Sequence, residues 1–166
     1  IITNRKNVFI EGKCRINPGG KFIIHTGNLI IKNNTTLSYN VTIITGNHTP
    51  TTGIPQFELG HLHFNDKETD IIIHEDVWIG ANATILSGAE LGRGCIIGAC
   101  SLVNKPIPPY AVVAGVPTKI IGVKFSLEQI IKHEKILYKK NERINIDYLK
   151  SLFETIYKDC KVLGRL

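Results

Sequence analysis

Aliphatic residues recur at every sixth position along much of this chain. Across residues 73–107, the first position of each block of six is always aliphatic and the fifth is mostly small. The first positions are Ile73, Ile79, Ile85, Leu91, Ile97 and Val103, and the fifth positions are Val77, Ala83, Ala89, Cys95, Ser101 and Ile107. The same frame holds upstream at Ile31, Leu37 and Ile43, and in a shifted register at Ile10, Ile16 and Phe22.

A repeat of six residues fits neither the helical period of about 3.6 nor the strand period of about 2 alone. It predicts a short strand with one inward aliphatic residue and one inward small residue, followed by a turn. Stacked coils bury the aliphatic column, so each repeat depends on its neighbours for stability. The pattern therefore predicts an all-β solenoid.

The repeat is interrupted between Ile43 and Ile73. The intervening segment, about residues 45–70, begins with "TGNHTPTTG" and does not keep the six-residue frame. Long irregular segments inside compact domains are usually functional or disordered. Apolar side chains within this one favour a packed arm over a flexible linker; they are Ile54, Phe57, Leu59, Leu62 and Phe64.

The hydrophobic period changes again after residue 122. "FSLEQIIKHEKILY" and "YLKSLFETIYKDC" both place apolar residues at helical spacing. Ser126 and Gln129 have the spacing of a capping box at the start of the first segment. We therefore expect two domains: a β-solenoid over residues 1–122, and a C-terminal extension over residues 123–166 whose two helices cover the solenoid.

Composition narrows the class of protein further. The chain has 166 residues and a net charge of +6, without a basic run interleaved with aromatic residues, so we expect no nucleic-acid partner. No stretch approaches the roughly 18–20 apolar residues of a membrane span, and the first residues do not have the pattern of a secretory signal. The four cysteines show no CxxC spacing and are expected to be reduced. These features favour a cytoplasmic protein.

Residues 76–122 carry a more specific pattern. The motifs "DVWIG", "IGACS" and "IPPYAVVAGVP", followed by a basic residue, closely resemble those of galactoside, maltose and streptogramin O-acetyltransferases in the hexapeptide-repeat family. This resemblance implies a left-handed parallel β-helix and a homotrimer that binds acetyl-CoA between adjacent subunits. The segment "KFSLEQIIKHEKILY" is similar to the tails of acetyltransferases of surface-polysaccharide synthesis, which favours a carbohydrate acceptor.

The resemblance also implies which residues bind acetyl-CoA. Members of the family use backbone groups at the positions of Ala81 and Ala99, and polar or basic side chains at those of Asn104, Lys105 and Lys119. Glycines leave room for a narrow groove, and an outward-facing Trp78 would form a ligand wall or an interface. The candidate residues are Trp78, Gly80, Ala81, Gly98, Ala99, Asn104, Lys105 and Lys119.

His48 stands at the start of the arm, in a "TG-H" context that matches the catalytic histidine of the family. Transfer to a hydroxyl needs a base, and an imidazole with a pKa near about 6.5 suits this role near neutral pH. A backbone N–H would stabilise the oxyanion. His25 falls near the position where galactoside-type enzymes bind the acceptor with an acidic residue, so it is a candidate acceptor contact.

Other functions stay open at this stage. His61 and His63 could chelate a metal, and related β-helical carbonic anhydrases bind zinc or iron through three histidines. Two of those histidines form an H-x4-H pair that this chain lacks, so we expect no metal. The remaining alternatives are an amino-sugar N-acetyltransferase, a carbonic-anhydrase-like protein and a non-catalytic scaffold.

Overall fold

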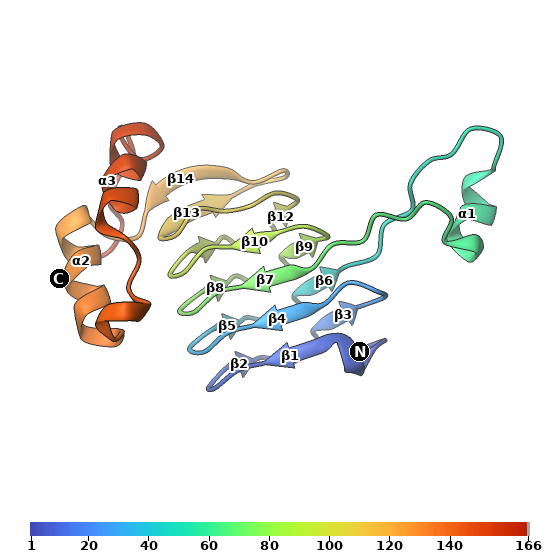
Figure 1. The fold of residues 1–166 in the computed structure, drawn as a ribbon, viewed down its shortest axis with the longest axis horizontal. Helices are drawn as coiled ribbons and strands as arrows, with labels where there is room; N and C mark the ends of the chain where they lie inside the picture. The colour runs from blue at the N-terminus through green and yellow to red at the C-terminus, as the bar shows by residue number, and fades with distance from the viewer. Residues whose placement is uncertain (166) are drawn as a thin grey trace.

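The computed structural model describes residues 1–165 and shows a stack of short strands that forms a β-helix (Figure 1). Each complete coil contributes three strands. The strands are β1 (Val8–Ile10), β2 (Arg15–Ile16), β3 (Lys21–Ile23), β4 (Leu29–Ile31), β5 (Thr36–Leu37), β6 (Thr42–Ile44), β7 (Ile71–Ile73), β8 (Trp78–Ile79), β9 (Thr84–Leu86), β10 (Glu90–Leu91), β11 (Ile96–Ile97), β12 (Leu102–Val103), β13 (Ala111–Ala114) and β14 (Lys119–Val123).

Three sheets form the faces of the stack, in the strand orders β1-β4-β7-β10, β14-β13-β11-β8-β5-β2 and β12-β9-β6-β3. All pairings are parallel except that of β13 with β14. This arrangement confirms the predicted left-handed parallel β-helix. Because β14 turns back against β13, residues 119–123 form a return strand and not a further coil.

The inward positions predicted from the repeat form the core. All six first positions and all six fifth positions between residues 73 and 107 are buried, as are Ile31, Leu37 and Ile43 upstream. Aliphatic side chains of successive coils stack on one another, as in the register Ile43, Ile85, Val103. Burial of this column supplies the main favourable free energy of the fold.

Two inward positions in the first coil are exposed. Ile10 and Ile16 are 48% and 38% accessible, because they lie at the end of the stack and no described residue packs beneath them. Phe22 in the same coil is buried. Residues 1–3 run alongside it and exchange backbone hydrogen bonds with Phe22. The prediction of an inward side chain holds, but burial requires a neighbouring coil.

The turns between strands have a common backbone geometry. In the blocks of six that begin at residues 31, 37, 73, 79, 85, 91 and 97, the fourth position adopts a left-handed conformation, with φ between 57° and 78°. Asn, Asp and Gly tolerate this conformation better than most residues. These three residue types occupy every such position except that of Cys100. The positions are Asn34, Asn40, Asp76, Asn82, Gly88, Gly94 and Cys100. The repeat predicts a turn, and these left-handed residues show where in those blocks it lies.

One corner of the stack has no room for a side chain at its glycines. A Cβ at Gly80 would lie 2.5 Å from the amide nitrogen of Ala99, in the next coil. We therefore expect Gly80→Ala to lower the free energy of unfolding by about 1–3 kcal/mol, the usual cost of overpacking. Urea denaturation measures this change. Gly60→Ala is the matched control, since its Cβ would meet nothing within 4 Å; equal losses in the two variants would contradict the expectation.

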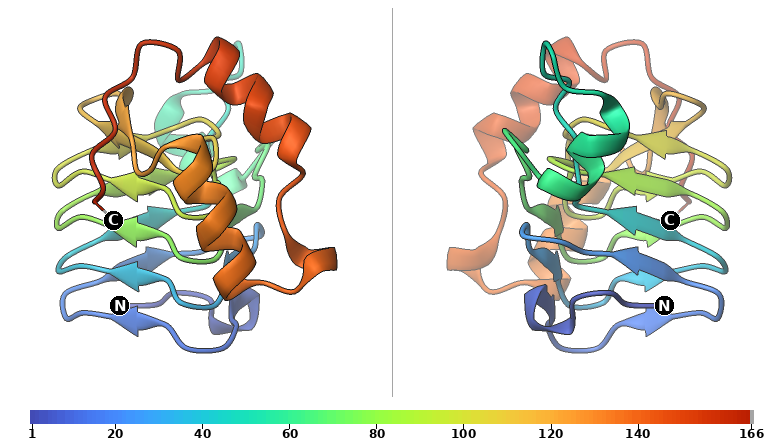
Figure 2. Two further views of the ribbon diagram at one scale, coloured as in Figure 1. Left: turned by 90° about the vertical axis from the view of Figure 1, so that its left-hand side faces the viewer. Right: turned by 90° about the vertical axis from the view of Figure 1, so that its right-hand side faces the viewer.

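The arm leaves the stack after β6 and returns at β7 (Figures 1 and 2). It contains one short helix, α1 (Gln56–Leu62). Of the apolar residues expected to pack, Leu59 alone is fully buried, whereas Phe57, Leu62 and Phe64 are 76%, 61% and 51% exposed. The prediction of a packed arm is therefore wrong for the single chain, because the arm projects away from the β-helix and has little protein to pack against.

The predicted C-terminal helices are α2 (Leu127–Leu137) and α3 (Ile146–Thr155). They lie on the side of the β-helix opposite the arm (Figures 1 and 2). Two short 3-10 helices complete the elements, η1 (Arg5–Asn7) and η2 (Lys140–Glu142). Ser126 and Gln129 form the expected capping box. None of the described helices is long and apolar enough to cross a membrane.

A buried carboxylate attaches α2 to the β-helix. Glu134 is 2% exposed and accepts hydrogen bonds from the Tyr110 hydroxyl at 2.6 Å and from the Ile144 amide at 3.0 Å. The hydroxyl of Tyr110 binds Oε1, whereas the Ile144 amide shares Oε2 with the Arg93 guanidinium, which donates at 3.0 Å. Burial, together with the Glu134 carboxylate, raises the pKa of Tyr110, so its hydroxyl stays protonated. Every oxygen of this buried group thus has a donor.

Candidate functional site

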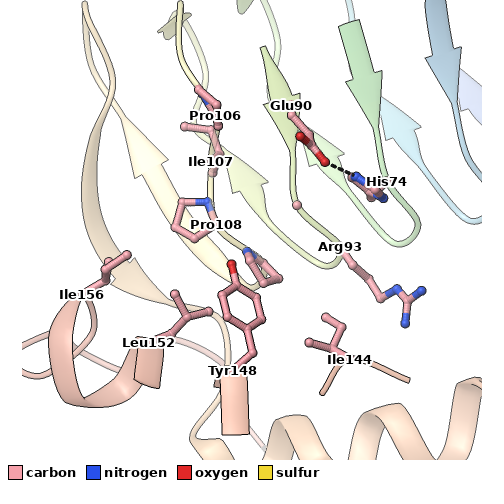
Figure 3. Close-up of a pocket in the computed structure, with 12 residues that line it drawn as sticks. His74, Glu90, Arg93, Pro106, Ile107, Pro108, Ile144, Tyr148, Leu152 and Ile156 are labelled. Carbon is pink, nitrogen blue, oxygen red and sulfur yellow. Dashed lines mark hydrogen bonds and ion pairs between the residues drawn. The ribbon is translucent and has the colours of Figure 1, made fainter. Parts of the chain in front are cut away.

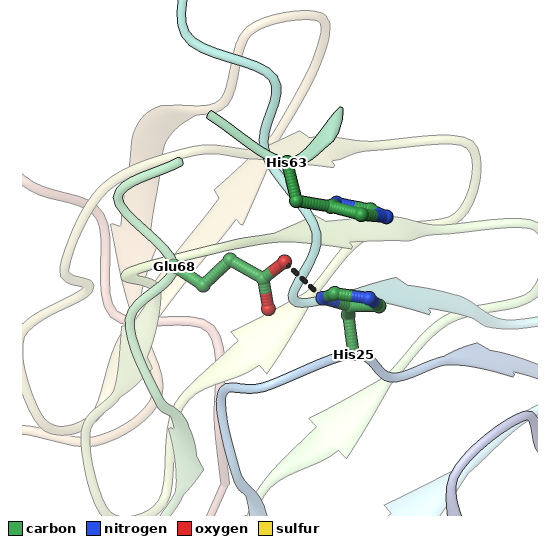
Figure 4. Close-up of side chains that lie close together, drawn as sticks. All are labelled: His25, His63 and Glu68. Atoms are coloured by element: carbon green, nitrogen blue, oxygen red, sulfur yellow. Dashed lines mark ion pairs between the residues drawn. The ribbon is translucent and has the colours of Figure 1, made fainter. Parts of the chain in front are cut away.

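Three histidines from distant segments meet where the arm joins the β-helix. His25 follows β3, His48 begins the arm and His63 follows α1. The rings of His25 and His63 stack with centroids 4.1 Å apart, and those of His48 and His63 lie 5.5 Å apart. Figure 4 shows His25 and His63 beside the carboxylate of Glu68. We call these three histidines, with Asp66 and Glu68, the histidine cluster.

Asp66 lies between two imidazoles. Its Oδ2 is 3.3 Å from Nδ1 of His48 and 3.0 Å from Nδ1 of His63, while its Oδ1 accepts from the Thr49 amide at 3.2 Å. Burial alone would raise the pKa of Asp66, but hydrogen bonds from His63 and Thr49 and the nearby His48 outweigh it and hold the pKa below 3.8. The carboxylate is therefore ionised near neutral pH.

This contact favours one tautomer of His48. A carboxylate at Nδ1 holds the imidazole proton on that nitrogen and leaves Nε2 free to accept another proton. The His48 side chain is 44% exposed, so a substrate can approach it. The arrangement can support general-base chemistry at Nε2 of His48.

Glu68 holds the return of the arm against the loop that contains His25. Its side chain is 3% exposed, and its Oε2 accepts from the amides of Thr26 and Gly27 at 2.6 and 3.1 Å. The Thr26 hydroxyl also donates to Oε2, and Nδ1 of His25 lies 2.8 Å from Oε1. Glu68 thereby fixes His25, the predicted acceptor contact, next to His63.

The arm contact with Glu68 should depend on pH. Burial would raise the pKa of Glu68, but the donors from Thr26 and Gly27 and the nearby His25 outweigh it and lower the pKa below 4.5. A lowered pKa in the folded state stabilises the fold above the unfolded value, and this stabilisation is lost as the pH falls through the folded value. We expect the NMR amide signals of Thr26 and Gly27 to shift with a midpoint below 4.5.

Glu68→Gln should abolish that transition. It should also speed hydrogen exchange of the Gly27 amide about tenfold near neutral pH, because hydrogen bonds to a charged group are stronger than neutral ones by about 1–1.5 kcal/mol. An unchanged pH transition in Glu68→Gln would assign it to another group.

A second set of predicted residues lies on one corner of the stack. Gly80 and Ala81 follow β8, and Gly98 and Ala99 follow β11 one coil later. A Cβ at Gly98 would lie 2.9 Å from that of Ala114, so three coils approach closely here. Within residues 1–165, the amides of Ala81 and Ala99 donate to no protein acceptor. They are therefore available to a ligand.

Trp78 lies on the face that leads to this corner. It pairs with Thr36 of β5 and Ile96 of β11, and its side chain is 55% exposed. The predicted outward orientation is confirmed. Together with the open amides of Ala81 and Ala99, it gives this corner an apolar wall beside polar backbone groups.

The basic candidates lie at the next corner. Asn104 and Lys105 follow β12 and Lys119 begins β14, and all three are exposed. Lys105 also lines a cavity of about 230 Å³ that contains Thr118. The Thr118 hydroxyl is buried and has no hydrogen-bond partner among the described residues. This corner thus offers the positive charge of Lys105 and Lys119 to a ligand.

The two corners and the arm border the same sheet, β12-β9-β6-β3. Gly80–Ala81 and Gly98–Ala99 precede its strands β9 and β12, while Asn104 follows β12 and the arm follows β6. Ile43 pairs with Ile85, and Ile85 pairs with Val103. Two strand spacings therefore separate the backbones of Ile43 and Val103, a distance of about 10 Å. The arm that carries His48 therefore leaves the corner on which Lys105 lies.

A larger cavity, of about 470 Å³, lies between α3 and the coil end and shares Pro106, Ile107, Pro108 and Ile156 with the smaller cavity (Figure 3). His74 and Glu90 in its wall are paired at 2.8 Å, and Arg93 is bound by Glu75 and Glu134. None of the predicted site residues lines it. Because its charged side chains are engaged in internal contacts, we do not assign the active site to this cavity.

Comparison with known proteins places these features in context. Residues 70–105 match the family described as bacterial transferase hexapeptide (six repeats). A probable macrolide acetyltransferase of Lysinibacillus sphaericus is 38% identical over 122 residues, which are 73% of this chain and 63% of that protein. A chloramphenicol acetyltransferase of Klebsiella aerogenes is 44% identical over 64 residues, which are 39% of this chain. The chain spans only 30% of that protein's length.

Solved structures share the fold. A hexapeptide-repeat acetyltransferase from Vibrio cholerae O1 biovar eltor, complexed with acetyl-CoA, superposes with a TM-score of 0.62 at 24% identity, over 71% of this chain and 61% of that one. A polySia-specific acetyltransferase superposes with a TM-score of 0.58 at 29% identity, over 69% of this chain and 50% of the other.

Proposed function

We propose that this chain, which belongs to the hexapeptide-repeat acetyltransferase family, transfers an acetyl group from acetyl-CoA to a hydroxyl group of a carbohydrate. The observation that carries the proposal is the exposed imidazole of His48, whose Nδ1 lies 3.3 Å from the carboxylate of Asp66. This is the geometry expected of an oriented general base.

In the proposed reaction, Nε2 of His48 takes the proton of the acceptor hydroxyl as its oxygen attacks the thioester carbonyl carbon. The negative charge of Asp66 stabilises the imidazolium that forms. A backbone N–H of the groove stabilises the oxyanion. The carbon–sulfur bond then breaks, the CoA thiolate takes the proton from His48, and no covalent bond to the enzyme forms.

The corner residues suit the donor substrate. The free amides of Ala81 and Ala99 can donate to the carbonyl groups of the pantetheine arm, and Trp78 can cover its apolar face. Lys105 and Lys119 can neutralise the CoA phosphates, with Asn104 beside them. The absence of side chains at Gly80 and Gly98 keeps the groove narrow.

We further propose that the protein acts as a homotrimer with its sites between subunits. Phe57, Leu62 and Phe64 of the arm and Trp78 of the sheet are all more than half exposed, which favours burial against another copy. A neighbouring subunit packed against the arm would place its groove beside His48, at the base of the arm. Sedimentation at micromolar concentration tests this: a monomer would contradict a site shared between subunits.

The acceptor is proposed to be a saccharide hydroxyl, on the basis of the likeness to a polySia-specific acetyltransferase. The identity of 38% with a probable macrolide acetyltransferase favours a second candidate, an antibiotic hydroxyl. Both candidates are alcohols, and both would use the same base.

A transfer assay against a panel of acceptors tests the proposal. The panel comprises mono- and oligosaccharides, sialic acid polymers, a macrolide, chloramphenicol and an amino sugar, with CoA release and product mass as readouts. An acetyl product that hydroxylamine cleaves is an ester and supports O-transfer. A stable amide formed only from the amino sugar would favour N-transfer, and a lack of acetyl-CoA binding would favour a non-catalytic scaffold.

A further inference from the structure

We propose that His48, His63 and Asp66 form a binding site for a divalent metal ion of the zinc type, and that the ion blocks acetyl transfer because it is bound by the His48 imidazole. The effect on transfer rests on the proposed function, whereas metal binding itself does not. The chain has no H-x4-H pair, so its sequence alone predicts no metal. The fold instead gathers these ligands from the beginning and the end of the arm.

The ligand atoms have a suitable spacing. One donor atom from each of the three residues lies within 4.8 Å of the other two. Nδ1 of His48 and Nδ1 of His63 lie 3.3 and 3.0 Å from the same oxygen of Asp66. Ligands bonded at about 2.0–2.1 Å to a tetrahedral zinc ion lie about 3.3 Å apart, so small side-chain adjustments would admit the ion.

The donor set selects the class of metal. Two imidazole nitrogens and one carboxylate oxygen suit zinc and its neighbours in the first transition row, whereas calcium and magnesium prefer oxygen ligands alone. Three protein ligands leave one position open. The imidazoles of His48 and His63 are 44% and 38% exposed, so an ion can enter from solvent.

The other residues of the cluster support this site. Glu68 already accepts from Thr26 and Gly27, which commits it to holding the loop. His25 is fixed by Glu68 and stacks on the ring of His63. Contacts of this kind orient metal-binding side chains. We therefore assign the ligands to His48, His63 and Asp66, with His25 and Glu68 as their supports.

Metal binding and catalysis would exclude each other. A neutral imidazole that binds a metal through Nδ1 carries its proton on Nε2. His48 in that state has no lone pair on Nε2 with which to take a proton from a hydroxyl. The ion would also be bound by the Asp66 carboxylate, which otherwise orients His48.

Titration of the EDTA-treated full chain with Co²⁺ tests the site independently of turnover. Visible absorption reports tetrahedral cobalt, and Zn²⁺ should displace it. We expect one site per chain, weakened about 100-fold or more in His63→Gln and in Asp66→Asn, since loss of a direct ligand costs at least as much as loss of a supporting contact. His61→Gln is the control, because His61 packs on Phe57 outside the cluster. Circular dichroism verifies that each variant is folded.

Each outcome bears on the inference. Zinc inhibition of transfer that EDTA reverses, with cobalt binding lost in His63→Gln, supports it. Cobalt binding that survives in both variants, or a sulfur-to-cobalt charge-transfer band, would place the metal at other groups and overturn the site. Metal binding without inhibition, or hydration of carbon dioxide by the zinc-loaded chain, would overturn the inhibitory role. A chain that binds cobalt but transfers no acetyl group would contradict the proposed function and leave the metal site standing.

Discussion

Replacement of His48 by alanine is expected to reduce kcat for acetyl transfer by a factor of about 100–10,000, the usual contribution of a positioned general base. The loss follows because the acceptor hydroxyl is a poor nucleophile until its proton is removed. The assay is steady-state release of CoA with the best acceptor of the panel. Calorimetry should show that acetyl-CoA binding is retained.

The matched control is His61→Ala, two residues from His63 but outside the histidine cluster. It should retain wild-type kcat. If His48→Ala transfers acetyl groups at the wild-type rate, another group serves as the base. If both variants lose activity, the arm as a whole, and not the imidazole of His48, limits the reaction.

Glu134→Ala is expected to lower the free energy of unfolding by about 3–5 kcal/mol, the cost of removing one partner from a buried ion pair. The substitution leaves the Tyr110 hydroxyl and the Ile144 amide without their acceptor, and the partly buried Arg93 without one of its carboxylates. Urea denaturation monitored by circular dichroism measures this loss.

Glu154→Ala provides the comparison, since Glu154 is exposed near the end of α3. Its effect should stay within about 0.5 kcal/mol, as for most surface substitutions. Near-equal midpoints for Glu134→Ala and wild type would mean that the attachment of α2 rests on apolar contacts alone. Tyr110→Phe should fall between the two, because it removes one donor and leaves Glu134 bound to Arg93.

The β-helix could be predicted from the sequence because its six-residue period is the spacing of the aliphatic residues along the chain. An aliphatic first position with a coil on both sides, such as Ile85 or Ile97, is buried by those coils, whatever the turns contain. The C-terminal helices could be predicted equally well, since their apolar spacing and the Ser126–Gln129 cap are local signals. Local periodicity cannot reveal where the stack ends, and the exposure of Ile10 and Ile16 was missed for that reason.

Less of the candidate site than of the fold could be predicted from the sequence. His48 stood out by its context, but its partner Asp66 lies 18 residues further on. Such a contact depends on how the arm closes, and no spacing rule encodes it. The acidic run "NDKETD" before β7 was the available signal for Asp66 and Glu68. The two were not singled out, because exposed acidic residues are common in loops.

The arm interrupts the chain without disturbing the register of the β-helix, since Ile31 before it pairs with Ile73 after it, and Ile44 with Leu86. The scaffold therefore constrains only the two points at which the arm departs and returns. Since the entropic cost of a longer loop grows slowly with its length, substitutions and insertions between those points can accumulate without loss of the core. Under the proposed function, exchange of the arm can change the acceptor, while the stack proposed to hold the donor stays the same.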